Sequence, residues 1–352
     1  MAGSRLQVAI VGAGNVGLAL ARMLVATGDY QVRVGDCTDE ACAQAISLGI
    51  EARQVDASSA TQLHAFLGSA DVAVAAVPDR LVSRIMNVAS QAGAQHLDFS
   101  THSETPANAD GTLKLSGCGV SPGLADLMIA RLSAQADGPI DVELAVGAIP
   151  ARRTNRLGYS LIWNLDGLYA EYTSPCEAIE NFELVEIPPL SRPLTIRLGQ
   201  TDYEAFSTAG VVGSIGNFAG TNIRNLTCRT IRYPGHLDYM QLLLDDFGLR
   251  HRRDLLRTIL QNGLDKAEGD IVLLHARSRR VDGEADPRTI TIRIEDAPGL
   301  GNALAAGSAA HAAYLIDNIS AGSRRLSQDD PDTFAGLVQS RFARGIMSIE
   351  EL

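Results

Sequence analysis

In the first part of the chain, the hydrophobic positions form short apolar runs separated by stretches with helical spacing. The separating stretches, notably 14–28 and 79–93, predict helices. The β-branched apolar runs predict strands at residues 6–12, 30–36, 51–57, 70–78 and 94–100. Because strands and helices alternate strictly, this part is predicted to form a doubly wound parallel sheet, the α/β Rossmann architecture.

The pattern then changes, starting with an amphipathic helix expected over 123–135 and ending with a long Gly/Ala-rich helix over 299–322. Between them, strand patterns lie at 140–150, 193–199 and 288–296, and helical patterns at 236–249 and 252–267. We therefore expect a Rossmann domain over 1–125 and a second α+β domain of largely antiparallel sheet over 126–298. The C-terminal helices, within 299–352, are expected to return to the first domain.

Composition narrows the range of partners. The chain has 352 residues and a formal net charge of −11, and no cluster of Lys and Arg reverses this charge locally. Such a charge repels nucleic-acid phosphates and anionic lipid, and no apolar stretch is long enough for a bilayer span. The five cysteines are scattered without a Cys-x-x-Cys pair, and the histidines lack metal-ligand spacing. We expect a cytoplasmic protein with reduced thiols and no metal, which binds neither nucleic acid nor membrane.

A glycine pattern marks the junction of the first predicted strand and helix. Gly12, Gly14 and Gly17 have the spacing Gly-x-Gly-x-x-Gly, and Asn15 and Val16 lie in the same turn. In this context the first glycine permits the tight turn, the second lets backbone approach a pyrophosphate, and the third lets helix and strand pack closely. The N–H groups at the helix start bind the anion. The pattern predicts a dinucleotide site, with a ligand-free glycine turn as the alternative.

An aspartate extends this predicted site to the second strand. Asp36 ends that strand about 20 residues after the glycines, where a carboxylate accepts hydrogen bonds from the adenosine ribose. Cys37 follows as a further cofactor contact, and the residues from Cys37 to Glu40 offer no arginine to hold a 2′-phosphate. NAD is therefore favoured over NADP. A solvated turn aspartate is the alternative.

The ends of the third and fourth strands are expected along the same carboxyl edge. Asp56 and Ala57 are predicted to contact the adenine side of the dinucleotide, and Val77 and Pro78 the nicotinamide side. For each of them, a residue that merely terminates a strand is the alternative.

Several distinctive segments resemble those of one enzyme family. They are the glycine turn, HLDFST at 96–101, GCGVSPGLAD at 117–126, YSLIWNLDGLYAEYTSP at 159–175, RTIRYPGH at 229–236 and the Gly-rich C-terminal helix. Together they resemble the saccharopine dehydrogenase-like amino-acid dehydrogenases, with the lysine 6-dehydrogenase branch nearest in length. The resemblance implies a substrate that lies between the Rossmann domain and the second domain.

The resemblance also implies which groups border the nicotinamide. These are Asp98 and Ser100, at the end of the fifth strand, and Cys118, Gly119 and Pro122 in the loop that follows. Oxidising an ammonium requires its deprotonation before hydride leaves the adjacent carbon. Asp98 is the candidate for holding and deprotonating the amine, with capping of the next turn as the alternative. For Cys118 a packing role is favoured over a reactive thiol, because no adjacent histidine would activate it.

Further candidate residues lie in the second predicted domain. Arg232 and His236 flank a proline turn, and the Arg232 guanidinium suits bidentate binding of a substrate α-carboxylate, with a surface salt bridge as the alternative. His236 begins a helix, so a structural and a catalytic role stay open. Tyr159, Trp163 and Tyr172 are implied as walls of the substrate pocket, with ordinary core packing as the alternative.

The resemblance implies NAD-dependent oxidative deamination of an amino-acid amine, most like that of lysine at its terminal amine, in a homodimer or homotetramer. Other functions stay open. An opine-type reductase would form or cleave a secondary amine such as saccharopine, and a carboxynorspermidine- or homospermidine-type synthase would retain its NAD. A redox-inert NAD-binding sensor is a further alternative.

Overall fold

The computed structural model of the chain describes residues 5–101, 111–162, 165–265, 269–283, 286–322, 326 and 330–352. The chain divides into two compact units. Unit 1 comprises Met1–Leu127 and Ala297–Ile346, and unit 2 comprises Met128–Asp296 and Met347–Leu352. The chain therefore passes from one unit to the other at 127/128, at 296/297 and at 346/347.

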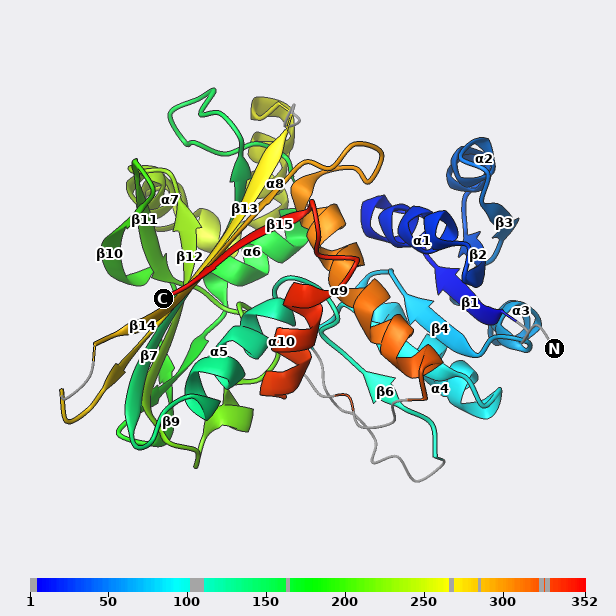
Figure 1. Cartoon of the computed structure of the whole chain (residues 1–352). Helices are drawn as coiled ribbons and strands as arrows, with labels where there is room; N and C mark the ends of the chain where they lie inside the picture. The colour runs from blue at the N-terminus through cyan, green and yellow to red at the C-terminus, as the bar shows by residue number, and fades with distance from the viewer. Residues whose placement is uncertain are drawn as a thin grey trace. The chain divides into compact units, whose positions relative to one another are not determined.

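Unit 1 is built on a sheet of six strands in the order β3-β2-β1-β4-β5-β6 (Figure 1). Its strands are β1 (Leu6–Val11), β2 (Tyr30–Asp36), β3 (Glu51–Gln54), β4 (Val72–Ala75), β5 (Gln95–Asp98) and β6 (Lys114–Leu115). Every pairing is parallel. The predicted Rossmann sheet is thus confirmed. β6 was not predicted, since a strand of two residues is too short to show a periodicity.

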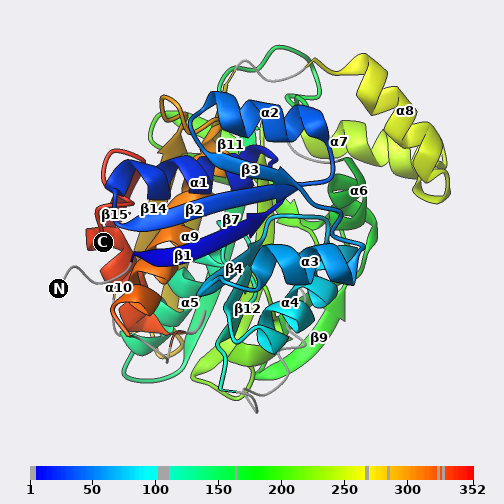
Figure 2. The same cartoon turned by 90° about the vertical axis from the view of Figure 1, so that its right-hand side faces the viewer.

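Helices cover both faces of this sheet, with α1 and α2 on one face and α3 and α4 on the other (Figure 2). The helices of unit 1 are α1 (Asn15–Thr27), α2 (Asp39–Ser47), α3 (Ala60–Leu67), α4 (Val82–Gln91), α9 (Ala303–Ser320) and α10 (Pro331–Gln339), and the 3-10 turn η1 (Asp79–Leu81) precedes α4. Alternate strand residues, such as Ala9, Val11 and Ala73, form one core with Phe66 of α3 and Ile85 of α4.

The long helix α9 packs against α1, although the two are far apart in the chain. Its sequence ALAAGSAAHAAYLIDNIS is buried on nearly all sides, because small side chains let it approach its neighbours closely. Gly336 of α10 permits a further close contact, since a Cβ there would lie 2.0 Å from the Tyr314 hydroxyl. The predicted small-residue helix is therefore confirmed over Ala303–Ser320.

Unit 2 is built on a mixed sheet of nine strands. Its main order is β10-β11-β12-β7-β13-β14-β15, and β8 pairs with β12 and with β9. The strands are β7 (Ile140–Pro150), β8 (Cys176–Glu180), β9 (Glu183–Ile187), β10 (Ser191–Leu198), β11 (Thr201–Ser207), β12 (Ile223–Arg232), β13 (Asp270–Arg280), β14 (Arg288–Glu295) and β15 (Met347–Glu351). Among the described strands of this second sheet, only β12 and β7 run parallel, so the largely antiparallel second sheet is confirmed.

Three helices of unit 2 bury their apolar sides in one cluster with Phe206 of β11, namely α6 (Leu165–Thr173), α7 (His236–Gln241) and α8 (Arg253–Gly263). The helix α5 (Leu124–Ala134), which begins in unit 1, and the 3-10 turn η2 (Ile215–Phe218) lie outside this cluster, and the 3-10 turn η4 (Leu249–His251) contributes Leu249 to it. The single helix predicted over 236–249 is wrong in its second half, where the π-helical turn η3 (Leu242–Asp246) follows α7. Gly248, at φ +67°, then ends the helical run, because a left-handed residue stops a helix.

The C-terminal residues depart from the expected helices. Residues 347–352 belong to unit 2, where β15 pairs with β14. Pairing with a strand distant in sequence leaves no local signal, which is why the pattern of the chain did not reveal it. Within the described part of the chain, no helix is both long enough and apolar enough to cross a membrane.

Candidate active site

The glycine turn between β1 and α1 is closed by contacts that leave no room for a side chain. A Cβ on Gly12 would lie 2.2 Å from the Ala76 carbonyl oxygen, and one on Gly17 would lie 2.0 Å from the Gly12 carbonyl oxygen. Gly12 also has a φ of +107°, which L side chains rarely adopt. Both contacts are with backbone, so these two glycines are structural requirements of the turn.

Gly14 differs from its neighbours, because a Cβ there would meet nothing within 4 Å. It is the N-cap of α1 and offers no side chain to the first N–H groups of the helix, where Asn15 and Val16 lie. An open backbone and an uncapped helix start form a cradle for a phosphate group. The residues therefore fit a pyridine dinucleotide, whose pyrophosphate needs this close approach.

Asp36, at the end of β2, connects the second strand with the glycine turn. Its Oδ2 accepts the Ala13 N–H at 2.8 Å, and its Oδ1 accepts the N–H and the hydroxyl of Thr38 at 3.0 and 3.1 Å. Burial opposes the charge, but these hydrogen bonds outweigh burial and lower the pKa of Asp36 below its ordinary value. Asp36 is therefore an anion beside the turn, and the neighbouring Cys37 is exposed.

Four more residues were predicted to contact the dinucleotide along this edge. Val77 lies beside the turn, since its Cγ1 would be 3.1 Å from a Cβ on Gly12, and Pro78 follows it as the N-cap of η1. Asp56 is exposed and its carboxylate accepts the N–H of the residue two positions on at 2.8 Å. Ala57 is buried in the core beside α3, and its contact with the adenine side stays a prediction.

Asp98, at the end of β5, is fully buried and surrounded by donors. Ser100 donates its N–H at 2.9 Å and its hydroxyl at 2.6 Å, and Ser116 donates its hydroxyl at 2.9 Å. Nε2 of His96 lies 3.1 Å from the second carboxylate oxygen. These contacts match the capping alternative for Asp98, and they engage the hydroxyl of Ser100, a predicted cofactor contact. The role of Asp98 in deprotonating an amine stays a prediction.

The loop after β6 has a tightly folded backbone. A Cβ on Gly123, at φ +125°, would lie 2.2 Å from the Gly117 carbonyl oxygen. Cys118 in this loop is fully buried, and its thiol donates to the Leu115 carbonyl oxygen at 3.3 Å, which fits the packing role favoured for it. Asp126 accepts the Gly123 N–H at 2.7 Å and so joins the loop to α5.

His311 of α9 contacts the same loop and was missed by the sequence analysis. It is fully buried, and its Nδ1 lies 2.8 Å from the Gly119 carbonyl oxygen, while Nε2 has no hydrogen-bond partner among the described residues. Burial lowers the pKa of His311 to about 4, so the ring is neutral and Nδ1 carries the donated proton. No ligand spacing in the sequence pointed to His311. In the described residues, no group of three or more His, Cys, Asp or Glu could hold a metal ion.

In unit 2, Tyr159, Tyr172, Arg232 and His236 meet and are almost fully buried. The Arg232 guanidinium lies 5.4 and 5.6 Å from the centroids of the two tyrosine rings. The His236 ring lies 5.7 Å from each tyrosine ring, edge-on. Trp163, predicted to belong with them, lies outside the described residues. The structure thus brings together residues from two separate segments of the chain, 159–175 and 229–236.

The hydrogen bonds of this cluster run in one direction. Arg232 Nε donates to the Tyr172 hydroxyl at 2.7 Å, and that hydroxyl lies 2.9 Å from Nε2 of His236. Nδ1 of His236 lies 2.8 Å from the Leu157 carbonyl oxygen, which can only accept. His236 therefore carries its proton on Nδ1 and accepts the Tyr172 proton on Nε2. Burial and the Arg232 cation lower the pKa of His236 to about 3, and burial raises the pKa of Tyr172, so both groups are neutral near pH 7.

Arg232 has a carboxylate partner within the protein. Its Nη2 lies 3.2 Å from Oε1 of Glu171, its Nη1 donates to the Ile231 carbonyl oxygen at 2.9 Å, and only 3% of the residue is exposed. The free fork predicted for a substrate carboxylate is therefore not present, because Glu171, Tyr172 and a backbone oxygen occupy its donors. The alternative salt bridge is present, but it is buried instead of exposed. A substrate carboxylate would reach Arg232 only by replacing Glu171.

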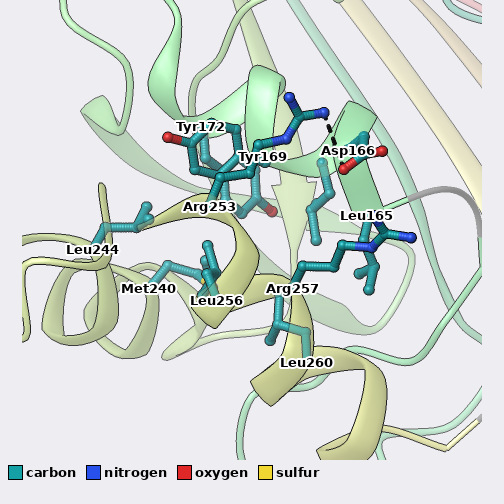
Figure 3. Close-up of a pocket in the computed structure, with 11 residues that line it drawn as sticks. Leu165, Asp166, Tyr169, Tyr172, Met240, Leu244, Arg253, Leu256, Arg257 and Leu260 are labelled. Carbon is teal, nitrogen blue, oxygen red and sulfur yellow. Dashed lines mark ion pairs between the residues drawn. The ribbon is translucent and has the colours of Figure 1, made fainter. Parts of the chain in front are cut away.

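A crevice lies beside this cluster, between α6 and the helices α7 and α8 (Figure 3). Tyr172 belongs to its wall, and Arg253 forms an ion pair with Asp166 there at 3.0 Å. Its lining is otherwise largely apolar, with residues such as Leu244 and Leu256. The crevice leaves only about 10 Å³ for the centre of a water molecule, which is room for one water at most. It is a packing crevice and not a substrate pocket.

Family models identify the protein family of this chain. The family model of the saccharopine dehydrogenase NADP binding domain matches residues 8–117, and that of the saccharopine dehydrogenase C-terminal domain matches residues 119–322. The chain belongs to the saccharopine dehydrogenase-like family. Membership identifies this chain as an oxidoreductase that binds a pyridine nucleotide and acts on an amino-acid substrate.

Solved structures bear on the fold of this saccharopine dehydrogenase-like chain. Saccharopine dehydrogenase (L-Glu forming) from Saccharomyces cerevisiae matches with a TM-score of 0.82 at 15% identity, over 99% of this chain and 100% of that one. UDP-N-acetylglucosamine 3-dehydrogenase from Acidithiobacillus ferrooxidans covers 97% of this chain and 98% of its own at 13% identity, but its TM-score of 0.40 is too low to carry an argument. The yeast structure shows the same fold over the chain. The two family models confirm the family resemblance of the sequence motifs.

In this saccharopine dehydrogenase-like chain, substitutions at Gly17 and Gly14 should have different effects, the first on stability and the second on cofactor binding. Gly17→Ala should lower the free energy of unfolding by about 3 kcal/mol, because its Cβ would overlap a backbone oxygen. Gly14→Ala should unfold like the wild type but bind NADH about ten-fold more weakly, because the methyl group occupies the phosphate cradle. Urea unfolding and NADH fluorescence titration measure the two effects. If Gly14→Ala bound NADH as tightly as the wild type, the assignment of the phosphate site to this turn would be wrong.

The buried, neutral His236 predicts a pH dependence of stability. Its pKa is about 3 in the folded chain and about 6.5 when unfolded, so only the unfolded chain binds this proton between those values. Stability must therefore fall as pH falls through this window, by about 2 kcal/mol for this group between pH 7 and pH 5. Urea unfolding at both pH values should show a smaller loss in His236→Gln by about that amount. His64→Gln, which removes an exposed histidine of α3, should keep the wild-type loss. Equal losses in all three proteins would mean that His236 is protonated in the folded chain.

Proposed function

We propose that this chain is an NAD-dependent dehydrogenase that oxidises the amine of an amino acid, with the terminal amine of lysine as the first candidate. The observation that carries the cofactor choice is the Asp36 carboxylate, held ionised beside the glycine turn by Ala13 and Thr38. A 2′-phosphate would meet this negative charge. Arg53, on the neighbouring strand β3, is paired with Glu51 at 3.0 Å, so an acidic group stands beside this cation as well. This argument favours NAD, although the matching family model is named for NADP.

The proposed reaction requires the protein mainly to position the substrate beside the cofactor. The bound nicotinamide supplies the hydride acceptor. The chain must place the amine-bearing carbon beside it and let the ammonium lose a proton first, because hydride leaves a carbon next to a neutral amine. Asp98 is our candidate for this proton, and Arg232 is our candidate for the substrate carboxylate, provided that it exchanges Glu171 for the substrate.

An amine panel tests this proposal. Lysine, saccharopine, cadaverine and the other amino acids are assayed with NAD and with NADP, and reduced nicotinamide is followed by its absorbance. We expect lysine with NAD to give net reduction, and cadaverine, which has the same terminal amine without a carboxylate, to be at least about ten-fold poorer in kcat/KM. Equal use of cadaverine would argue against carboxylate recognition. Oxidation of saccharopine alone would identify a secondary-amine dehydrogenase, and tightly held cofactor without net turnover would favour a synthase or a sensor.

Asp36→Ser should narrow the preference for NAD over NADP, because it removes both the ribose acceptor and the charge that repels a 2′-phosphate. The ratio of kcat/KM values for the two cofactors should fall by about ten-fold or more. Asp39→Ser removes the same charge from the exposed first turn of α2 and should leave the ratio near that of the wild type. A wild type that uses NADP as well as NAD would contradict the cofactor assignment.

Asp98→Asn distinguishes capping from acid-base chemistry. If Asp98 is a cap, the amide nitrogen faces the serine donors and the free energy of unfolding falls by about 1–3 kcal/mol. If Asp98 also accepts the substrate proton, kcat at neutral pH falls by about a hundred-fold or more in the protein that remains folded. We expect both losses, measured by urea unfolding and by kcat at temperatures where the variant is folded. A variant with reduced stability and unchanged kcat would leave Asp98 as a cap only.

A further inference from the structure

Unit 1 contains a cavity that the proposed reaction does not use. Its volume is about 460 Å³, within the usual range of small-molecule sites. Its walls come from the second half of α1, from residues 298–300 and from residues 341–346. Arg22, on this part of α1, lies seven residues after Asn15, which is about 10 Å along the helix axis. The cavity is therefore separate from the phosphate cradle at the helix start.

The charge of this cavity is opposite to that of the chain. Arg22, Arg341 and Arg344 line it, and none of its lining residues is acidic, whereas the chain has a net charge of −11. Arg341 is already paired, with Asp29 at 2.6 Å and Asp317 at 2.7 Å. Arg22 and Arg344 form no ion pair with any residue that the structure describes. The cavity thus offers two cations that lack an anion within the described chain.

Arg22 is held at the wall of the cavity. Its Nη2 lies 2.6 Å from the position that a Cβ would take on Gly299, which has a φ of +81°. The guanidinium therefore lies directly against the Gly299 backbone. Arg22 is also half-buried, so part of its freedom is already lost before any ligand arrives.

Apolar side chains complete the lining. Met23 and Phe342 are buried, and Leu300 and Ile346 are partly buried. A fully hydrated inorganic ion would gain nothing from the exposed parts of Leu300 and Ile346, whereas a ligand with an apolar body would remove them from water. The lining therefore fits an amphipathic ligand better than a simple ion.

We propose that this cavity binds a small organic anion whose carboxylate or phosphate head pairs with Arg22 and Arg344 and whose apolar body packs on Leu300 and Ile346. Two of the wall segments adjoin the points where the chain changes unit, 296/297 and 346/347. A ligand that contacts both segments opposes their local opening. Amide hydrogen exchange should therefore slow at 298–300 and 341–346 when the ligand is bound.

The test uses isothermal titration calorimetry on the full chain saturated with NAD, so that the phosphate cradle on α1 is filled. The probes are phenyl phosphate, phenylacetate, inorganic phosphate and benzyl alcohol. We expect at least one of the two aromatic anions to bind about ten-fold or more tightly than inorganic phosphate and benzyl alcohol, and the better anion identifies the head. Inorganic phosphate binding as tightly as both aromatic anions would overturn the role of the apolar body.

Matched variants locate the binding. Arg22→Gln and Arg344→Gln should each weaken the better aromatic anion by about ten-fold, because each removes a charge-assisted contact. Arg197→Gln, on the exposed part of β10, removes the same charge elsewhere and should bind like the wild type. Thermal unfolding establishes that each variant is folded, and exchange protection at 298–300 and 341–346 places the ligand. No binding to the wild type below about 10 mM, equal weakening in Arg197→Gln, or protection at other segments would overturn the proposal.

Discussion

The close packing of backbone on backbone at the glycine turn is the constraint on which the rest of unit 1 depends. Gly12 touches the end of β4, and Gly17 touches Gly12, so one strand end, one helix and a neighbouring strand meet at a single point. This contact sets how near α1 lies to the sheet, and it brings the Ala13 N–H within reach of Asp36 on β2. The cradle at Gly14 is a consequence, because it is the part of the turn where backbone is not covered by other backbone.

Local features of the fold could be predicted from the sequence because burial leaves a local pattern. The strands β1, β4 and β5 of unit 1 are largely buried, and β1 and β4 are apolar runs in the sequence, with the glycine turn directly after β1. The small residues of α9 likewise predicted a helix with close neighbours on several sides. In each case the residues that carry the signal are adjacent in the chain.

What could not be predicted depends on partners distant in sequence. The pairing of Arg232 with Glu171 spans 61 positions, and the contact of His311 with Gly119 spans 192. Nothing near either residue reveals its partner, so Arg232 was predicted with a free fork and His311 was not predicted at all. The strand β15 was missed for the same reason, because only its pairing with β14 makes it a strand. The grouping of Tyr159, Tyr172, Arg232 and His236 was predicted only through the family resemblance.

The polar cluster of unit 2 shows how a buried cation can order its surroundings. Arg232 donates to Tyr172, which leaves the tyrosine proton for His236 and the remaining histidine proton for a backbone oxygen. Each donor has one acceptor, so the rings of Tyr172 and His236 have a single orientation and a single tautomer. Such a network specifies one packing of α6 against β12 and α7, which a purely apolar core would define less sharply. The salt bridge to Glu171 completes it by satisfying the guanidinium charge.

The path of the chain has a consequence for how the protein is made. Unit 1 needs Ala297–Ile346 as well as its N-terminal part, and α9 covers the face of α1. During synthesis on the ribosome, the N-terminal sheet therefore emerges long before its covering helix, and the whole of Met128–Asp296 is translated in between. Until then the apolar face of α1 is exposed, so the nascent chain presents a binding surface for chaperones that the finished protein no longer has. Unit 2 differs, because it lacks only the edge strand β15 when its other strands have been translated. An edge strand is the easiest part of a sheet to add last.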